Sequence, residues 1–111
     1  MDDCIFCKII KGSITSSVID QDDDIMVIRD IAPKAPIHYL IIPKKHVKDI
    51  ASLEESDTYL VAKISSMAKK LSQQLHGSQS FRLIINNGID AGQSVWHLHC
   101  HFISGNHLSD F

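Results

Sequence analysis

The chain has 111 residues, a formal net charge of −2 and an isoelectric point near 6.3. This length suits one domain over residues 1–111, and the slightly acidic balance argues against nucleic acid or an anionic membrane as partner. The longest apolar runs, such as residues 39–42, are too short to cross a bilayer, and the first residues lack the features of a signal peptide. Three cysteines without a secretory signal suit a reducing compartment, so we expect a soluble, cytoplasmic protein.

The first half of the chain predicts one short helix followed by three strands. We expect a helix over residues 5–11 and strands over residues 18–20, 25–29 and 37–42. Gly12 can end the helix because glycine readily adopts the left-handed conformation. The acidic run at residues 22–24 predicts a hairpin turn between the first two strands. Pro33 and Pro36 interrupt the chain before the third strand, so a loop is expected there.

The second half predicts a long helix and two further strands. Ser52 and Glu55 have the spacing of a capping box, which predicts the start of the helix. Its apolar residues recur three or four positions apart on one face: Leu60, Ile64, Met67, Leu71 and Leu75. Gly77 is expected to end the helix, and strands follow over residues 81–86 and 96–103. This order predicts an α+β fold: an antiparallel sheet of about five strands with one long and one short helix.

The strand expected at residues 81–85 is apolar on both faces. Phe81, Leu83 and Ile85 share one face, and Ile84 lies on the other. Such a strand is usually buried on both sides, so we expect little of it to be exposed.

The segment from Trp96 to Ile103 contains three histidines at strict two-residue spacing. His97, His99 and His101 alternate with apolar residues, so in a strand the imidazoles would share one face and their neighbours would enter the core. Imidazole changes protonation near neutral pH, attacks phosphorus and binds metals. Two interpretations follow: a three-histidine metal site, or a catalytic row with one attacking histidine.

The residues before the histidines favour the catalytic row. Gly92, Gln93 and Ser94 stand just upstream, and Asn86 and Asn87 end an apolar run a few residues earlier. Such residues supply close backbone approach and neutral hydrogen-bond donors, which suit an anionic oxygen ligand such as phosphate. A pure metal site would not need them.

Four blocks of this chain resemble one protein family. The segment 86–103 resembles the signature of the histidine triad (HIT) family of hydrolases and transferases. Residues 4–10 (CIFCKII), 30–38 (DIAPKAPIH) and 42–46 (IPKKH) resemble blocks of its HINT branch, the histidine triad nucleotide-binding proteins. The order and spacing are those of the branch, and the blocks cover nearly the whole chain. The resemblance implies a HIT-like fold whose sheet continues across a homodimer.

The resemblance also implies a reaction. Members of the branch cleave purine nucleoside phosphoramidates, in which an AMP-like or GMP-like phosphate is joined to an amine. His99 would attack the α-phosphorus, and water would hydrolyse the covalent nucleotidyl-histidine that results. His101 would contact the phosphate and assist proton transfer, while Ser94 would donate to the leaving group or a phosphate oxygen. His38 corresponds to a more distant histidine that supports the row.

A nucleotide site is implied in the same way. Asp30 would accept hydrogen bonds from both ribose hydroxyls, and Asn86 would contact the phosphate. Further phosphate contacts would come from the preceding loop and the histidine row: Gly92, Gln93, Ser94, His99 and His101. The base pocket would have an apolar lining: Ile5, Phe6, Ile9, Ile28 and Ile31.

Cys4 and Cys7 have the spacing of half a structural zinc site, since two thiolates three residues apart can share one tetrahedral ion. In HIT relatives with this pair, the other ligands correspond to His46 and His97. The alternative is that both cysteines are simply small residues of a short helix. Cys100 falls on the face opposite the histidines and is expected in the core.

Other interpretations remain open from the sequence. Hydrolysis of dinucleoside polyphosphates occurs in another branch of the family, although the cysteine pair and the Pro-Lys-Lys-His block favour the phosphoramidase. A nucleotide-binding regulatory module with incidental activity is a third function. The residues themselves also allow Asp30 as a turn residue and His38 as a satisfied strand histidine.

Overall fold

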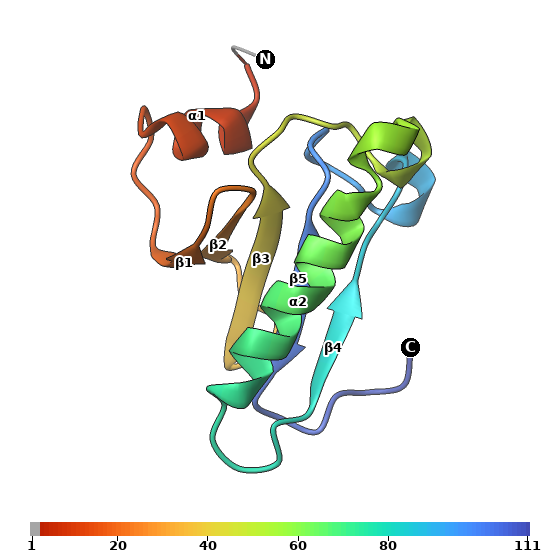
Figure 1. The fold of residues 1–111 in the computed structure, drawn as a ribbon. Helices are drawn as coiled ribbons and strands as arrows, with labels where there is room; N and C mark the ends of the chain where they lie inside the picture. Colours follow the sequence, from red (N-terminus) through yellow and green to blue (C-terminus); the bar gives the residue numbers. More distant parts are fainter. Residues whose placement is uncertain (1–2) are drawn as a thin grey trace.

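The computed structural model describes residues 3–111, which form an antiparallel sheet with two α-helices (Figure 1). The elements are α1 (Ile5–Lys11), β1 (Val18–Gln21), β2 (Ile25–Arg29), β3 (Ile37–Pro43), α2 (Tyr59–Gln73), β4 (Phe81–Ile84) and β5 (Cys100–Ser104). Short 3-10 turns lie at Ile50–Ser52, Glu55–Asp57 and Ile89–Ala91. The strand order β1-β2-β3-β5-β4 confirms the predicted five-stranded α+β fold. Within residues 3–111, no helix has both the length and the apolar character needed to span a membrane.

The N-terminal third follows the local signals in the sequence. Gly12 ends α1 in the left-handed conformation with φ at 84°. The side chain of Asp22 makes the hairpin turn, because its Oδ1 accepts from the backbone N–H groups of Asp24 and Ile25, each at 2.8 Å. This turn brings β1 and β2 together as an antiparallel pair.

The two faces of the sheet support two separate apolar clusters. On one face, side chains of β2, β3 and β5 pack against α2, and the buried members are Ile25, Val27, Ile41, Cys100, Phe102, Ile64, Met67, Ala68 and Leu71. On the other face, α1 inserts Phe6 among four strand residues: Met26, Ile28, Leu40 and Ile42. Strand alternation explains this division, since neighbouring residues of β2 and β3 point to opposite faces.

The start of the long helix differs from the prediction. The capping box at Ser52 and Glu55 does not form, because the backbone N–H of Ser52 donates to Asp49 Oδ1 at 2.9 Å and the chain makes two 3-10 turns first. Helix α2 therefore begins at Tyr59, and its N-cap residue, Thr58, makes no side-chain capping bond. The helix also ends at Gln73, before Gly77, which lies in the following turn.

Two strand predictions also need correction. Strand β4 is not buried on both sides: Phe81 and Leu83 are 38% and 40% exposed, because β4 is an edge strand and α2 packs over β2 and β3. The strand predicted over residues 96–103 is shorter than expected. It begins at Cys100, so that the first two histidines of the row precede it.

Candidate active site and metal centre

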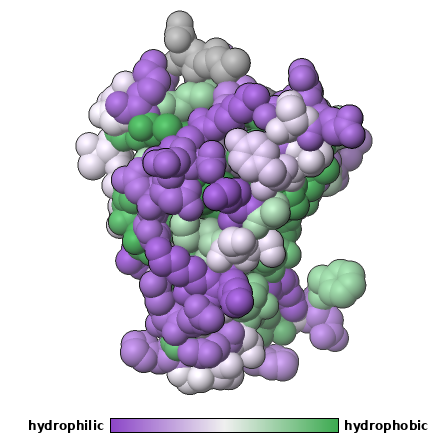
Figure 2. Space-filling view, in the orientation of Figure 1, coloured by the Kyte–Doolittle hydropathy of each residue, from purple (hydrophilic) through white to green (hydrophobic). Residues whose placement is uncertain are grey.

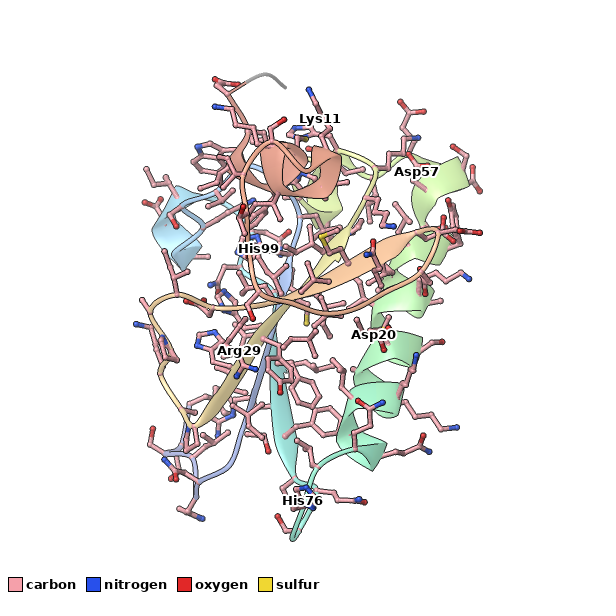
Figure 3. The ribbon with its side chains drawn as sticks, turned by 90° about the vertical axis from the view of Figure 1, so that its left-hand side faces the viewer. Lys11, Asp20, Arg29, Asp57, His76 and His99 are labelled. Carbon is pink, nitrogen blue, oxygen red and sulfur yellow. The ribbon has the colours of Figure 1, made fainter. Side chains whose placement is uncertain are left out.

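The histidine row lies on the α1 side of the sheet, and Figure 3 shows His99 beneath that helix. Although residues 96–99 are outside β5, the backbone N–H of Leu98 donates to the carbonyl of Val47 at 2.6 Å and holds this segment in place. Leu98 is buried, and Cys100 and Phe102 enter the α2-side cluster. The imidazole rings of His99 and His101 pack edge to face with centroids 5.2 Å apart.

One hydrogen bond sets the tautomer of His99. Its Nδ1 lies 2.8 Å from the backbone carbonyl oxygen of His97, and a carbonyl can only accept. Nδ1 therefore carries the proton, and in the neutral ring Nε2 has a free lone pair. The residue is only 8% exposed, and its ring packs edge to face with the Phe6 ring, with centroids 5.1 Å apart. The imidazole of His99 is thus fixed in one orientation and one tautomer, and Nε2 is its nucleophilic nitrogen.

A second chain of hydrogen bonds sets the protons of His38 and His101. The backbone N–H of Lys34 donates to His38 Nδ1 at 3.1 Å, so the proton of neutral His38 is at Nε2. That Nε2–H donates to His101 Nδ1 at 2.8 Å, with Asp30 Oδ2 3.4 Å from the same nitrogen. Neutral His101 must then carry its own proton at Nε2. The pair provides a donor beside the nucleophile.

Burial keeps both of these rings neutral. Loss of solvent lowers the pKa of His101 to about 4, and the nearby His99 and His38 lower it further if they are charged. Burial also lowers the pKa of His38, against the opposing attraction of Asp30. Asp30, His38 and His101 lie close enough to hold a cation, but the proton on His38 Nε2 occupies the nitrogen that would have to bind it.

The predicted zinc ligands converge on one point. Cys4 Sγ is 3.4 Å from His97 Nδ1, and Cys7 Sγ is 3.2 Å from His46 Nδ1 and 3.6 Å from His97 Nδ1. All four donor atoms lie within 4.8 Å of one another. A tetrahedral zinc ion with bonds of about 2.0–2.3 Å needs donors about 3.3–3.8 Å apart. The residues therefore fit a closed site with two thiolates and two imidazoles.

The protonation of His97 suits this site. Its Nε2 donates to the carbonyl oxygen of Pro43 at 2.7 Å, so the lone pair of the neutral ring is on Nδ1, the nitrogen that faces the two cysteines. The ring is fully buried, and desolvation lowers the pKa of His97 to about 4. A carbonyl acceptor on the outer nitrogen is the usual support of a metal-bound histidine.

The loop before the histidines uses its polar side chains in different ways. Gln93 is buried, with Oε1 accepting from the Gly88 N–H and Nε2 donating to the carbonyl groups of Lys48 and Val95. Its side chain thus holds the loop together, and its backbone N–H also donates within the loop, to the Gly88 carbonyl at 3.1 Å. Ser94 is exposed and lines a cleft of about 290 Å³ together with residues at the start of α1 and at the metal centre: Asp3, Cys4, Ile5, His46, Val95 and Trp96.

The residues predicted around the nucleotide lie in different surroundings. Phe6 and Ile28 are core residues of the α1-side cluster, whereas Ile5 and Ile31 are 45% and 97% exposed, and Ile9 packs against the cluster edge. Asp30 lines an open cleft of about 680 Å³, and its Oδ1 accepts from the Ala32 N–H at 2.8 Å. Gly92 has φ at 97°, and the Asn86 side chain packs 3.8 Å from the point where a Cβ would stand.

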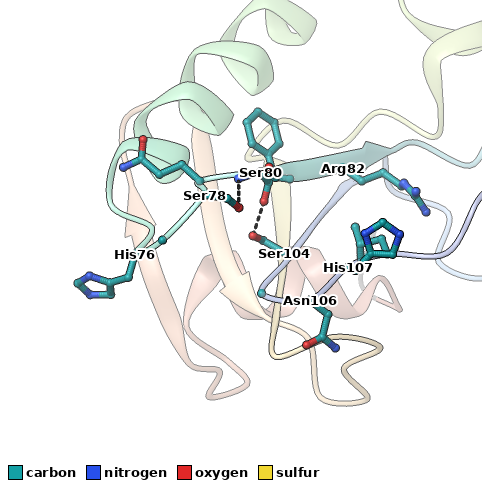
Figure 4. A pocket seen from close by; sticks show the side chains of 12 residues that line it. His76, Ser78, Ser80, Arg82, Ser104, Asn106 and His107 are labelled. Carbon is teal, nitrogen blue, oxygen red and sulfur yellow. Dashed lines mark hydrogen bonds between the residues drawn. The ribbon is translucent and has the colours of Figure 1, made fainter.

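Another cleft, of about 610 Å³, lies away from this site, between the turn after α2 and the C-terminal segment (Figure 4). Its lining includes His76 and His107, and the Ser104 hydroxyl donates to the Ser80 carbonyl beside it. Figure 3 places His76 at the lower end of the molecule, far below His99. His76 is therefore separate from the row.

Comparison with known proteins shows which family has this arrangement. The sequence model described as "Scavenger mRNA decapping enzyme C-term binding" matches residues 3–111. An uncharacterized HIT-like protein of Synechocystis is 37% identical over 108 residues, which cover 97% of this chain and 95% of that protein. The chain belongs to the histidine triad (HIT) family.

Solved HIT structures agree in fold. The crystal structure of a HIT family hydrolase from Legionella pneumophila matches with a TM-score of 0.91 and 41% identity, over 96% of each chain. A Zn-bound histidine triad family protein from Mycobacterium smegmatis matches with a TM-score of 0.84 and 28% identity, over 96% of this chain and 77% of its own. This HIT protein is therefore similar to hydrolases along almost its entire length.

The contacts that orient the histidines leave no signal in the sequence. The Lys34 N–H and the carbonyl groups of Pro43 and His97 belong to the backbone, so the residue types at these positions do not predict the hydrogen bonds. The Phe6 ring also packs edge to face with the imidazoles of His97 and His99, a contact that its predicted place in the base pocket does not include. The spacing of Phe6 between Cys4 and Cys7 is the one signal that links it to the site.

The neutral His101 predicts a loss of stability in mildly acidic solution. Unfolded histidine has a pKa near 6.5, whereas the pKa of folded His101 is about 4. As the pH falls from 6.5 towards 4, the unfolded chain binds a proton that the folded chain does not, so this contribution to stability is lost. We expect His101→Gln to remove roughly 1–3 kcal/mol of this pH dependence. Urea unfolding between neutral pH and about pH 4 measures it, with the exposed His76→Gln as control; equal pH dependence in His101→Gln and wild type would contradict the prediction.

Proposed function

We propose that this HIT protein is a nucleotide hydrolase of the HINT branch, which cleaves purine nucleoside phosphoramidates through a covalent nucleotidyl-histidine. The observation that supports this most is the His99 Nδ1–H bond to the His97 carbonyl, because it leaves Nε2 as a free nucleophile. The similarity to HIT hydrolases supports the reaction class. The cysteine pair and the Pro-Lys-Lys-His block support the branch.

The proposed reaction has two displacements at phosphorus. In the first, the His99 Nε2 lone pair forms a bond to the α-phosphorus while the bond from phosphorus to the amine nitrogen breaks. The departing amine accepts a proton from His101 Nε2–H after that ring has taken up a second proton from solvent, or it accepts one through the Ser94 hydroxyl; burial lowers the pKa of His101 to about 4, so the doubly protonated ring is a strong acid and returns to its neutral form. In the second, water attacks phosphorus, the P–N bond to His99 breaks, and the nucleoside monophosphate leaves.

Dinucleoside polyphosphates are the alternative substrate class, and a regulatory nucleotide-binding role is the alternative function. Turnover of an adenosine phosphoramidate and of a diadenosine polyphosphate, measured side by side, separates them. The proposal requires the phosphoramidate to be the better substrate. Nucleotide binding without turnover of either compound would favour the regulatory role.

We further propose that Cys4, Cys7, His46 and His97 bind one structural zinc ion. The converging donor atoms support this, as does the Zn-bound relative from M. smegmatis. Four protein ligands close the coordination sphere, so the ion would stabilise the fold and leave no position for substrate.

A homodimer built on β4 is the proposed assembly. Strand β4 is an edge with free backbone groups, and its exposed Phe81 and Leu83 lie on the α2 face. Figure 2 shows apolar surface along the side of the molecule that carries β4. A second copy pairing at this edge would cover these side chains and extend the sheet, as the resemblance to the branch implies.

The zinc site predicts one metal ion per chain. Elemental analysis of protein purified without chelator should find about one zinc, and replacing Cys4 and Cys7 together by Ser should remove it. Cys100→Ala provides the matched control, because this buried thiol is outside the donor set and its loss should leave the zinc in place. The cysteine variant should unfold at lower temperature because metal binding adds to folding free energy. Metal-free wild-type protein of full stability would reject the site.

The dimer predicts a solution mass of about twice 12.4 kDa. Leu83→Lys should produce a monomer, because it places a charge at the centre of the proposed interface. Val18→Lys is the matched control, since Val18 is similarly exposed on β1, the opposite edge strand. Light scattering of the three proteins tests this, and a wild-type monomer at micromolar concentration would overturn the assembly.

The proposed nucleophile predicts separate effects on turnover and binding. His99→Asn should remove nearly all turnover yet change nucleotide affinity by less than about tenfold, or roughly 1.4 kcal/mol. In wild type, quenching during turnover without acid should trap a nucleotide on the protein through an acid-labile P–N bond. His76→Asn, at the far end of the molecule, should behave as wild type. Residual turnover in His99→Asn without a trapped adduct would indicate direct attack by water and reject the covalent route.

A further inference from the structure

Helix α1 links the metal centre to the proposed nucleophile through Phe6. The helix contributes Cys4 as its N-cap and Cys7 in its first turn, and Phe6, its one buried residue, lies between them. The Phe6 ring meets two imidazoles edge to face: His97 at 5.8 Å and 80°, and His99 at 5.1 Å and 76°. The same turn of helix thus supplies two metal ligands and a wall of the His99 site.

His97 provides the second link. Its Nδ1 belongs to the metal donor set, its Nε2–H is bound by the Pro43 carbonyl, and its own carbonyl accepts the Nδ1–H of His99. Any shift of the His97 backbone therefore moves the acceptor that fixes the His99 tautomer. Two contacts orient His99: the Phe6 ring and the His97 carbonyl. Phe6 lies between two of the metal-binding residues in the sequence, and His97 is itself one of them.

The length of α1 makes this connection important. Seven residues are too few for an isolated helix to be stable in water, so α1 depends on its tertiary contacts. Among them, the cysteine thiols face His46 and His97 at hydrogen-bond distance, and a metal ion would replace these weak contacts by four coordinate bonds. Without the metal, the first turn has only these weak thiol–imidazole contacts and its apolar packing to hold Phe6 against the imidazoles.

We propose that Phe6 is a positioning residue for His99, and that metal bound by Cys4, Cys7, His46 and His97 keeps both Phe6 and the His97 carbonyl in place. The metal centre then acts on the reaction without touching substrate. This inference rests on the proposed zinc site, and its effect on turnover rests on the proposed function. It gives Phe6, a buried apolar residue, a role in the orientation of the nucleophile.

The orientation of His99 can be measured without substrate. Long-range ¹H–¹⁵N NMR spectra at a fixed alkaline pH distinguish the Nδ1–H from the Nε2–H tautomer of a neutral imidazole. Metal-loaded wild type should show His99 as Nδ1–H alone. Phe6→Leu, which retains all four metal ligands, should keep its metal and show a mixture of tautomers, and the metal-free Cys4→Ser, Cys7→Ser protein should show the same mixture.

Two controls separate positioning from general loss of stability. Ile10→Val alters apolar packing of the same helix against the same cluster, and Met67→Ala weakens the core on the opposite face of the sheet. Both should lower the unfolding temperature and leave His99 as Nδ1–H. An unchanged His99 tautomer in Phe6→Leu, with metal present, would overturn the role of Phe6 even if the double cysteine variant failed to fold.

Turnover gives an independent reading. Phe6→Leu should lower kcat by about ten- to a hundredfold, since misplacement of a reacting group by about 1 Å has effects of this size, while nucleotide affinity changes by less than about twofold. A fall in affinity with unchanged kcat would instead place Phe6 in the base pocket and overturn the inference. If wild type turns over no phosphoramidate but the tautomer responds to metal and to Phe6→Leu, the proposed function fails and the positioning role stands.

Discussion

A neutral imidazole has two nitrogens and one proton, and the arrangement of this protein depends on where the fold places that proton in each buried histidine. Backbone groups decide it. Carbonyl acceptors bind one N–H of His97 and of His99, and the Lys34 N–H occupies the acceptor nitrogen of His38. The unprotonated nitrogen differs between the rings. In His97 it is Nδ1, whose lone pair faces two thiols, and in His99 it is Nε2, whose lone pair lies beside a proton donor.

The sheet makes this possible by keeping its two faces apart. Alternation along β5 sends Cys100 and Phe102 into the cluster under α2 and leaves His101 on the side of α1. The α2 side is a conventional apolar core that stabilises the sheet. The α1 side has a smaller cluster around Phe6, and the imidazoles and thiols of the site lie beside it. Stability and chemistry therefore occupy opposite faces of the same strands.

His97 connects the metal centre and the proposed nucleophile, because its side chain serves the first and its carbonyl the second. The proposed zinc ion would therefore affect the reaction from this position without meeting the substrate. Edge strand β4 leaves apolar surface uncovered in the single chain. Its apolar side chains are exposed in the single chain, which is understandable if the pattern on β4 evolved for burial against a second copy.

Much of this architecture could be predicted from residue patterns, because it depends on local rules. Gly12, the Asp22 turn and the apolar stripe of α2 act over a few residues, and the boundaries of α1 and β2 follow from them. The ordered histidine, cysteine and Pro-Lys-Lys-His blocks indicated the family and the four converging donors. Two local predictions were wrong. The capping box did not form because Asp49 accepts the Ser52 N–H, and the last strand is shorter because the chain bends before Cys100. The exposure of β4 was decided by where α2 lies on the sheet. The proton on each histidine was decided by backbone carbonyl and N–H groups, of which the Pro43 carbonyl comes from a distant segment and those of Lys34 and His97 from nearby residues. Such atoms are the same in every residue, so only the tertiary structure could show which of them face an imidazole.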